Sequence, residues 1–157
     1  MDQVKIDTLA NYPQCVSQVV DWLYKEWGDN NFKYWNSWIR NSINNEGIPQ
    51  TFIIFVNNEL AGTYSLWRCD LQSRQDLFPW FGGLYVNPKF RGKIFNGEKL
   101  GVLMQHDAIN RVRTLGYKMI YLFTEKNTKY YNDNGWTSIG TTFDEKDNQV
   151  SLCKYDL

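Results

Sequence analysis

Apolar residues in the first third of the chain recur every three or four positions. This spacing is typical of one face of a helix, and it predicts a helix over residues 12–27 and another over residues 32–44. An Asn-Glu-Gly run and Pro49 follow the second helix and are expected to end it. The amino-terminal part is therefore expected to be helical.

The middle of the chain has the pattern of strands. Residues 51–56 (TFIIFV) are apolar and β-branched, and residues 60–68 follow after an Asn-Asn-Glu turn, which predicts a β-hairpin. Residues 80–86 (WFGGLYV) predict a third strand, in which the adjacent Gly82 and Gly83 indicate a bulge or a close backbone approach.

Helical and strand-like patterns alternate in the rest of the chain. The expected elements are a helix over 101–115, a strand over 117–123, a short helix over 127–134, and strands over 136–142 and 150–155. The whole order predicts an α/β fold with a mixed sheet. No repeat, low-complexity tract or linker interrupts the sequence, so residues 1–157 are expected to form a single domain.

Composition narrows the class of protein. Lysine plus arginine equal aspartate plus glutamate, 17 against 17, so no electrostatic argument favours nucleic acid or an anionic membrane as partner. Aromatic residues make up 17%, which is high; such residues fill cores and also line concave ligand sites.

The amino terminus lacks the pattern of a signal peptide, and no apolar run approaches the roughly 20 residues that a membrane span requires. We therefore expect a cytoplasmic protein. Three scattered cysteines without CxxC spacing argue against a disulfide framework and a zinc site. His106 is the only histidine, which disfavours a Ser-His-Asp hydrolase or a multi-histidine site. No metal is expected.

Two segments of the second half carry a family pattern. Residues 84–93 (LYVNPKFRGK) form an apolar-x-Val-x-Pro segment followed by an aromatic residue and Arg-Gly. Residues 130–136 (YYNDNGW) form a late aromatic-Tyr-x-x-x-Gly-aromatic element. In this order, the two segments resemble the GNAT superfamily of N-acetyltransferases.

The resemblance implies the GNAT fold, a mixed, mostly antiparallel sheet flanked by helices and splayed between its fourth and fifth strands. It also implies an acetyltransferase that moves an acetyl group from acetyl-CoA to a primary amine by direct attack in a ternary complex. The acceptor would be a small molecule or a peptide, and the protein a monomer or homodimer.

The resemblance further implies where acetyl-CoA would bind. The pantetheine arm would bond to the strand backbone, and the pyrophosphate would meet a glycine-containing loop, basic side chains and a helix N-terminus. The expected cofactor-binding residues are Leu84, Tyr85, Val86, Arg91, Gly92, Lys93, Gly97, Gly101 and Asn127.

Tyr131 is the expected catalytic residue, a general acid that protonates the departing thiolate, although the adjacent Tyr130 leaves open which ring points inward. A general base is also required for the amine. Glu26, Asp70 and Asp76 lie in segments that could border the acceptor, and an ordered water is the alternative.

The segment after Arg91 departs from the family pattern. It is longer than usual, and Lys99 stands where the family has a glycine before the final Gly101, unless Gly97 supplies that glycine and the helix begins early. The alternative function is accordingly a non-catalytic ligand-binding module with the GNAT fold and a remodelled pyrophosphate loop.

Overall fold

The computed structural model describes all 157 residues, Met1–Leu157. Its helices are α1 (Val16–Trp27), α2 (Phe32–Arg40), α3 (Leu100–Thr114) and α4 (Thr128–Asp133). Its strands are β1 (Val4–Thr8), β2 (Gln50–Val56), β3 (Glu59–Trp67), β4 (Trp80–Val86), β5 (Ile94–Phe95), β6 (Glu98–Lys99), β7 (Met119–Thr124), β8 (Thr137–Phe143) and β9 (Gln149–Asp156).

Seven strands form one sheet in the order β1-β2-β3-β4-β7-β9-β8, and β5 pairs with β6 separately. Strands β4 and β7 are parallel, whereas β1–β2, β7–β9 and β8–β9 are antiparallel. The β4–β7 register consists of Trp80 opposite Tyr121, at the first residue of β4, which is consistent with the predicted opening between these strands. The predicted mixed, mostly antiparallel α/β sheet flanked by helices is confirmed.

Close contacts divide the chain into two compact units. Unit 1 consists of Met1–Ser65 and Gly83–Asp107, and unit 2 of Leu66–Gly82 and Ala108–Leu157. Strand β4 begins in unit 2 and ends in unit 1, and α3 begins in unit 1 and ends in unit 2. The single domain over 1–157 stays a prediction.

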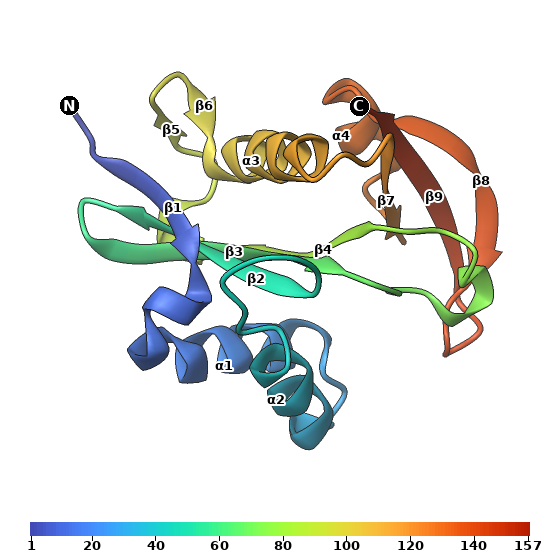
Figure 1. The fold of residues 1–157 in the computed structure, drawn as a ribbon, viewed down its shortest axis with the longest axis horizontal. Helices are drawn as coiled ribbons and strands as arrows, with labels where there is room; N and C mark the ends of the chain where they lie inside the picture. The colour runs from blue at the N-terminus through green and yellow to red at the C-terminus, as the bar shows by residue number, and fades with distance from the viewer. The chain divides into compact units, whose positions relative to one another are not determined.

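The core of unit 1 forms around β2. Six of the seven residues of this strand are buried, as expected for an apolar run that is covered on both faces. Figure 1 shows α1 and α2 on one side of the unit 1 strands, and the β5–β6 hairpin with the start of α3 on the other. Val19 and Leu23 of α1 and Ile39 of α2 are fully buried, so the helical faces predicted from the sequence pack into this core.

Strand β1 is an element that the sequence pattern did not predict. It pairs antiparallel with β2 at the edge of the sheet, with Val4 opposite Val56 and Thr8 opposite Phe52. Only Val4 and Ile6 are apolar in this short segment, so the alternation is too brief to predict a strand without its partner.

Helix α2 ends at Arg40, four residues before the predicted end at 44. The Asn41 side chain donates from Nδ2 to the carbonyl oxygen of Ser37 at 2.8 Å, and Ser42 Oγ donates to that of Ile39 at 2.7 Å. Short polar side chains that bind the carbonyls of the last turn in this way compete with further helical turns. The helix therefore stops before the glycine and proline that were expected to end it.

The core of unit 2 is built from β7, β9 and large aromatic residues. Residues of β7 alternate between half-buried and buried positions, as expected for a strand with one covered face. Trp80, Leu122, Trp136 and Cys153 are at most 3% exposed. None of the helices in the structure has the length and apolar character needed to cross a bilayer.

Candidate active site

The end of β4 is the first feature that fits a ligand. In the strand order β4 lies between β3 and β7, a position in which residues are usually buried. Trp80 and Phe81 are indeed buried, but the next five residues, from Gly82 to Val86, are all half-buried. Leu84, Tyr85 and Val86 are therefore partly accessible in the middle of a sheet, as expected for a strand that an extended ligand pairs with.

Arg91 is anchored next to this strand. Its Nε donates to the Val86 carbonyl oxygen at 2.7 Å, and its guanidinium carbon lies 5.1 Å from the centre of the Tyr85 ring. The ring of Trp22 in α1 also stacks on Tyr85, with centroids 5.1 Å apart. The Tyr85 ring thus has a packing function, and Arg91 is exposed at the end of β4.

The segment after Arg91 forms a small hairpin rather than the single loop that the sequence suggested. Ile94 pairs with Lys99 and Phe95 with Glu98. Asn96 and Gly97 make the two-residue turn, with φ of 52° and 87°, which is the conformation that an Asn-Gly hairpin turn requires. The added residues are therefore accommodated by local pairing, and the conformation of Gly97 follows from the turn itself.

The remaining residues of the expected pyrophosphate loop flank this hairpin. Gly92 has φ of 75° and no atom within 4 Å of the position that a Cβ would take, so its backbone is open to close approach. Lys93 is exposed beside it. Helix α3 begins at Leu100, and Gly101 is its buried second residue, so the first free N–H groups of the helix directly follow β6.

Tyr131 lies in α4, in unit 2, and is the more buried of the two adjacent tyrosines. Its ring makes edge contacts with Tyr130 and with Trp136, at centroid distances of 5.0 and 6.2 Å. Tyr130 is 37% exposed. Burial, followed by the proximity of Tyr130 and Cys153, raises the pKa of the Tyr131 phenol well above its usual value. The phenol therefore stays protonated at neutral pH.

Asn127 immediately precedes α4. Its N–H donates to Thr124 Oγ1 at the end of β7 at 3.0 Å, and its carbonyl oxygen accepts from the Tyr131 N–H at 3.1 Å. The backbone of Asn127 thus joins the end of β7 to the turn that carries Tyr131. Its side chain makes no cap hydrogen bond and is exposed.

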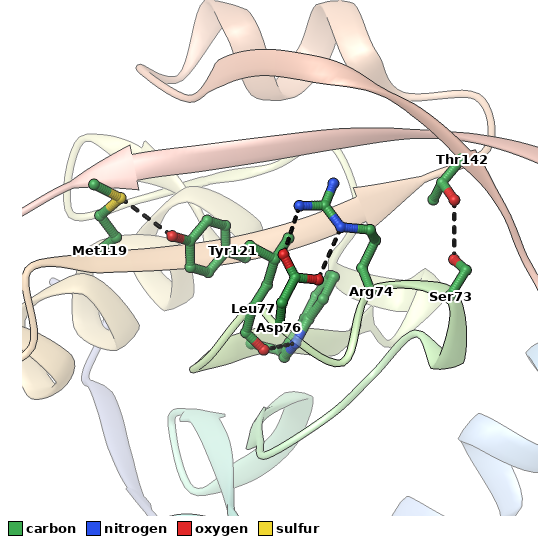
Figure 2. A network of polar contacts seen from close by, with 8 residues as sticks. Ser73, Arg74, Asp76, Leu77, Met119, Tyr121 and Thr142 are labelled. Atoms are coloured by element: carbon green, nitrogen blue, oxygen red, sulfur yellow. Dashed lines mark hydrogen bonds and ion pairs between the residues drawn. The ribbon is translucent and has the colours of Figure 1, made fainter.

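A segment between β3 and β4 is fixed in unit 2 by a polar network (Figure 2). Thr142 Oγ1 donates to Ser73 Oγ at 3.0 Å, and Ser73 Oγ donates to the Phe143 carbonyl oxygen at 2.9 Å. Arg74 forms two 2.9 Å hydrogen bonds with the Asp76 carboxylate. The hydrogen bonds of Ser73 hold the segment against β8, and the Arg74–Asp76 pair lies within the segment.

The same segment contains Asp70, one of the three acids considered as a base. Its side chain is half-buried. Burial, and secondly the negative charge of Glu145, raise the pKa of its carboxyl to about 7. Of the other two acids, Asp76 is paired with Arg74 and Glu26 is exposed on α1. Spacing along the sequence gave no signal that distinguishes Asp70, because its environment comes from residues distant in the chain.

No group of three or more His, Cys, Asp or Glu side chains in the structure is arranged to hold a metal ion. The single histidine, His106, lies exposed on α3.

No protein-family model matches the sequence, and no curated protein is significantly similar to it. The fold, in contrast, is shared with many solved structures. An aminoglycoside 6'-N-acetyltransferase complexed with coenzyme A is similar over 97% of this chain and 96% of its own, with a TM-score of 0.77 and 15% sequence identity.

Two other structures extend this likeness. An acetyltransferase from Streptococcus agalactiae 2603 has a TM-score of 0.71 and 22% identity, with 98% of each chain covered. RimL, described as a ribosomal L7/L12 alpha-N-protein acetyltransferase in complex with coenzyme A, has a TM-score of 0.63 and 16% identity over 98% of this chain and 94% of its own. The chain therefore has the fold of the GNAT superfamily of N-acetyltransferases.

Proposed function

We propose that this protein transfers the acetyl group of acetyl-CoA to a primary amine. The observation that carries the proposal is the half-buried end of β4, which is followed in the chain by Arg91, the open Gly92, a short hairpin and the start of a helix. The similar structures support it, because they are described as acetyltransferases and two of them contain coenzyme A.

In this proposal the backbone of β4 holds the acyl donor. Backbone groups near Leu84 and Val86 bond to the amide groups of the pantetheine arm as a neighbouring strand would. One backbone N–H polarises the thioester carbonyl and stabilises the negative charge that develops on its oxygen. The half-buried state of these residues supports this role, because a fully covered strand would have no free edge.

The phosphates of the donor are bound by the segment after β4. Arg91 and Lys93 supply positive charge, and Gly92 allows close approach of the backbone. The N–H groups at the start of α3, near Gly101, supply further donors. The helix dipole contributes about 0.3–1 kcal/mol at an exposed site, so the converging N–H groups and side chains provide most of the binding.

Tyr131 is the proposed general acid. A thiolate that leaves the tetrahedral intermediate requires a proton, and a phenol with a raised pKa retains one across the neutral range. The acceptor is a primary amine of a small molecule or a peptide. The similar structures include enzymes described for an aminoglycoside and for a ribosomal protein, so the fold accommodates acceptors of both kinds.

Binding of acetyl-CoA is expected to raise the melting temperature. At about 100 times its dissociation constant a ligand stabilises the folded state by about 2.7 kcal/mol, which for a chain of this size is a shift of about 5–10 °C. Differential scanning fluorimetry with acetyl-CoA, and with acetate as the control ligand, measures it. An unchanged melting temperature at millimolar acetyl-CoA contradicts the proposal.

Replacing Arg91 by alanine is expected to weaken acetyl-CoA affinity by about tenfold or more, with little change in turnover at saturation. A hydrogen bond between charged groups contributes about 1.5–3 kcal/mol, and about 1.4 kcal/mol corresponds to a tenfold change in affinity. Calorimetric titration measures the affinity. Lys89→Ala is the matched control, because Lys89 lies on the same loop but is paired with Glu59 at 2.7 Å. A larger loss of turnover than of affinity would show that the phosphates bind elsewhere.

A further inference from the structure

The carboxylate of Asp70 occupies the space that a side chain at position 82 would fill. A Cβ added to Gly82 would lie 2.5 Å from Asp70 Oδ2 and 2.9 Å from Nε1 of Trp67. The absence of a side chain at Gly82 thus allows the carboxylate to lie directly against β4. Asp70, Trp67 and Gly82 all belong to unit 2.

The surroundings of this carboxylate disfavour its ionised form. Burial and the negative charge of Glu145 both raise its pKa, and neither a cation nor a hydrogen-bond donor offsets them. The two arginines of the segment between β3 and β4 have other partners, because Arg74 pairs with Asp76 and Arg68 lies over the Phe78 ring at 5.8 Å. A half-buried carboxylate without a cation lowers stability, and such groups concentrate at functional sites.

We propose that Asp70 is the general base that accepts the proton of the acceptor amine. This inference rests on the proposed acetyl transfer and adds the residue that the transfer still lacks. Tyr131 supplies a proton to the leaving group, whereas an incoming ammonium group must lose one before its nitrogen can attack. The pair of carboxylates, Asp70 and Glu145, also favours an acceptor that arrives as a cation.

The place at which the Asp70 carboxylate lies against β4 suits this role. Gly82, against which the carboxylate lies, precedes Leu84 by two residues in the same strand. Gly83 between them has φ of 61° and is not in regular strand geometry, so the two positions are at most about 7 Å apart along the chain. The carboxylate thus lies against the same strand whose Leu84 and Val86 backbone we propose binds the acyl donor.

The protons and electrons balance over the reaction. The ammonium group transfers one proton to Asp70, and the lone pair thus freed forms the new N–C bond to the thioester carbon. The carbonyl electrons move to oxygen and return as the C–S bond breaks, with its electron pair leaving on sulfur. Tyr131 donates its proton to the sulfur and regains one from the attacking nitrogen, and Asp70 releases its proton to water. The products are the acetamide, coenzyme A and one proton.

The test compares wild type, Asp70→Asn and Asp76→Asn by thiol release from acetyl-CoA between pH 5.5 and 9. The acceptors are a panel of a polyamine, an amino sugar and a peptide with a free amino terminus. We expect the wild-type kcat/KM for the amine to rise with pH to a plateau that begins near pH 7, where Asp70 is ionised. Asp70→Asn should lose at least about tenfold in kcat and lose this inflection, whereas Asp76→Asn should retain both.

A second readout does not depend on activity. The pKa of Asp70 is about 7 in the folded protein and near 3.9 in an unfolded chain. Between these values the folded protein binds a proton that the unfolded chain has lost. The free energy of unfolding of the wild type therefore falls as the pH rises from about 4 to 7. Asp70→Asn lacks this loss. The variant should therefore melt at a higher temperature than wild type at pH 8, with the difference disappearing near pH 4.

Each outcome has one meaning. Absence of thiol release in wild type with every amine overturns the proposed function and this inference with it. Thiol release in Asp70→Asn with the wild-type rate and pH profile overturns the inference alone, as does a raised KM without loss of the inflection. An equal melting temperature of wild type and Asp70→Asn at pH 8 and pH 4 shows that the carboxyl is not in the environment described, and also overturns it.

Discussion

Tyr131→Phe is expected to lower turnover by more than tenfold while leaving acetyl-CoA affinity nearly intact. The substitution removes only the hydroxyl, and the edge contact of the ring with Trp136 is retained. Proton donation to a leaving group by a positioned side chain contributes about 10²–10⁴ in rate. Steady-state thiol release with each amine acceptor, combined with calorimetric titration of acetyl-CoA, separates the two quantities.

The adjacent tyrosine offers the matched control for this experiment. Tyr130→Phe makes the same chemical change one residue away, on a ring that is 37% exposed, and turnover should stay within about twofold of wild type. If Tyr131→Phe turned over at the wild-type rate, Tyr131 would have no part in proton transfer. If Tyr130→Phe were the slower variant, the assignment would pass to the other ring.

The largest expected loss of stability comes from Trp80→Ala. Trp80 is fully buried in unit 2, and its Nε1–H donates to the Leu77 carbonyl oxygen at 2.7 Å. Its ring lies near Tyr121 and Phe123, at centroid distances of 6.2 and 6.3 Å. Truncation of a buried tryptophan costs about 3–5 kcal/mol because it leaves a cavity, and here it also leaves a carbonyl without its donor. Urea unfolding measures the free energy.

Trp27→Ala serves as the comparison for this loss. Trp27 is 42% exposed on α1 and contacts Trp35 at a centroid distance of 6.3 Å, so its truncation should cost about 1 kcal/mol or less. A cost for Trp80→Ala below that of Trp27→Ala would mean that the start of β4 is not part of a closed core.

The proposed acid and the proposed base differ in pKa, and this difference determines the pH dependence of the reaction. The pKa of the Tyr131 phenol is raised further above the neutral range, so this residue contributes no inflection to the pH profile near neutrality. The carboxyl of Asp70, with a pKa of about 7, contributes an inflection near neutral pH. A single rising limb below pH 7 is therefore the profile that the two residues together produce.

Much of the fold was predictable because its elements have strong local patterns. The predicted strand over 80–86 has the same bounds as β4, and the predicted helices over 12–27, 101–115 and 127–134 correspond to α1, α3 and α4. Strand β1 and the end of α2 were not predicted. Strand β1 depends on pairing with β2, which is distant in the chain, and the end of α2 depends on side-chain hydrogen bonds.

The sequence alone determined the order of the elements, the position of the Arg91 and Gly92 segment after a strand, and the two tyrosines beside a turn. These features are local, because hydrophobic periodicity and turn chemistry act over a few residues. Only the tertiary structure decided that Tyr131 is the more buried ring. It likewise decided that the long segment after Arg91 closes into a hairpin, and that Asp70 lies against Gly82. Exposure and pKa depend on residues that approach from other parts of the chain, and periodicity carries no information about those contacts.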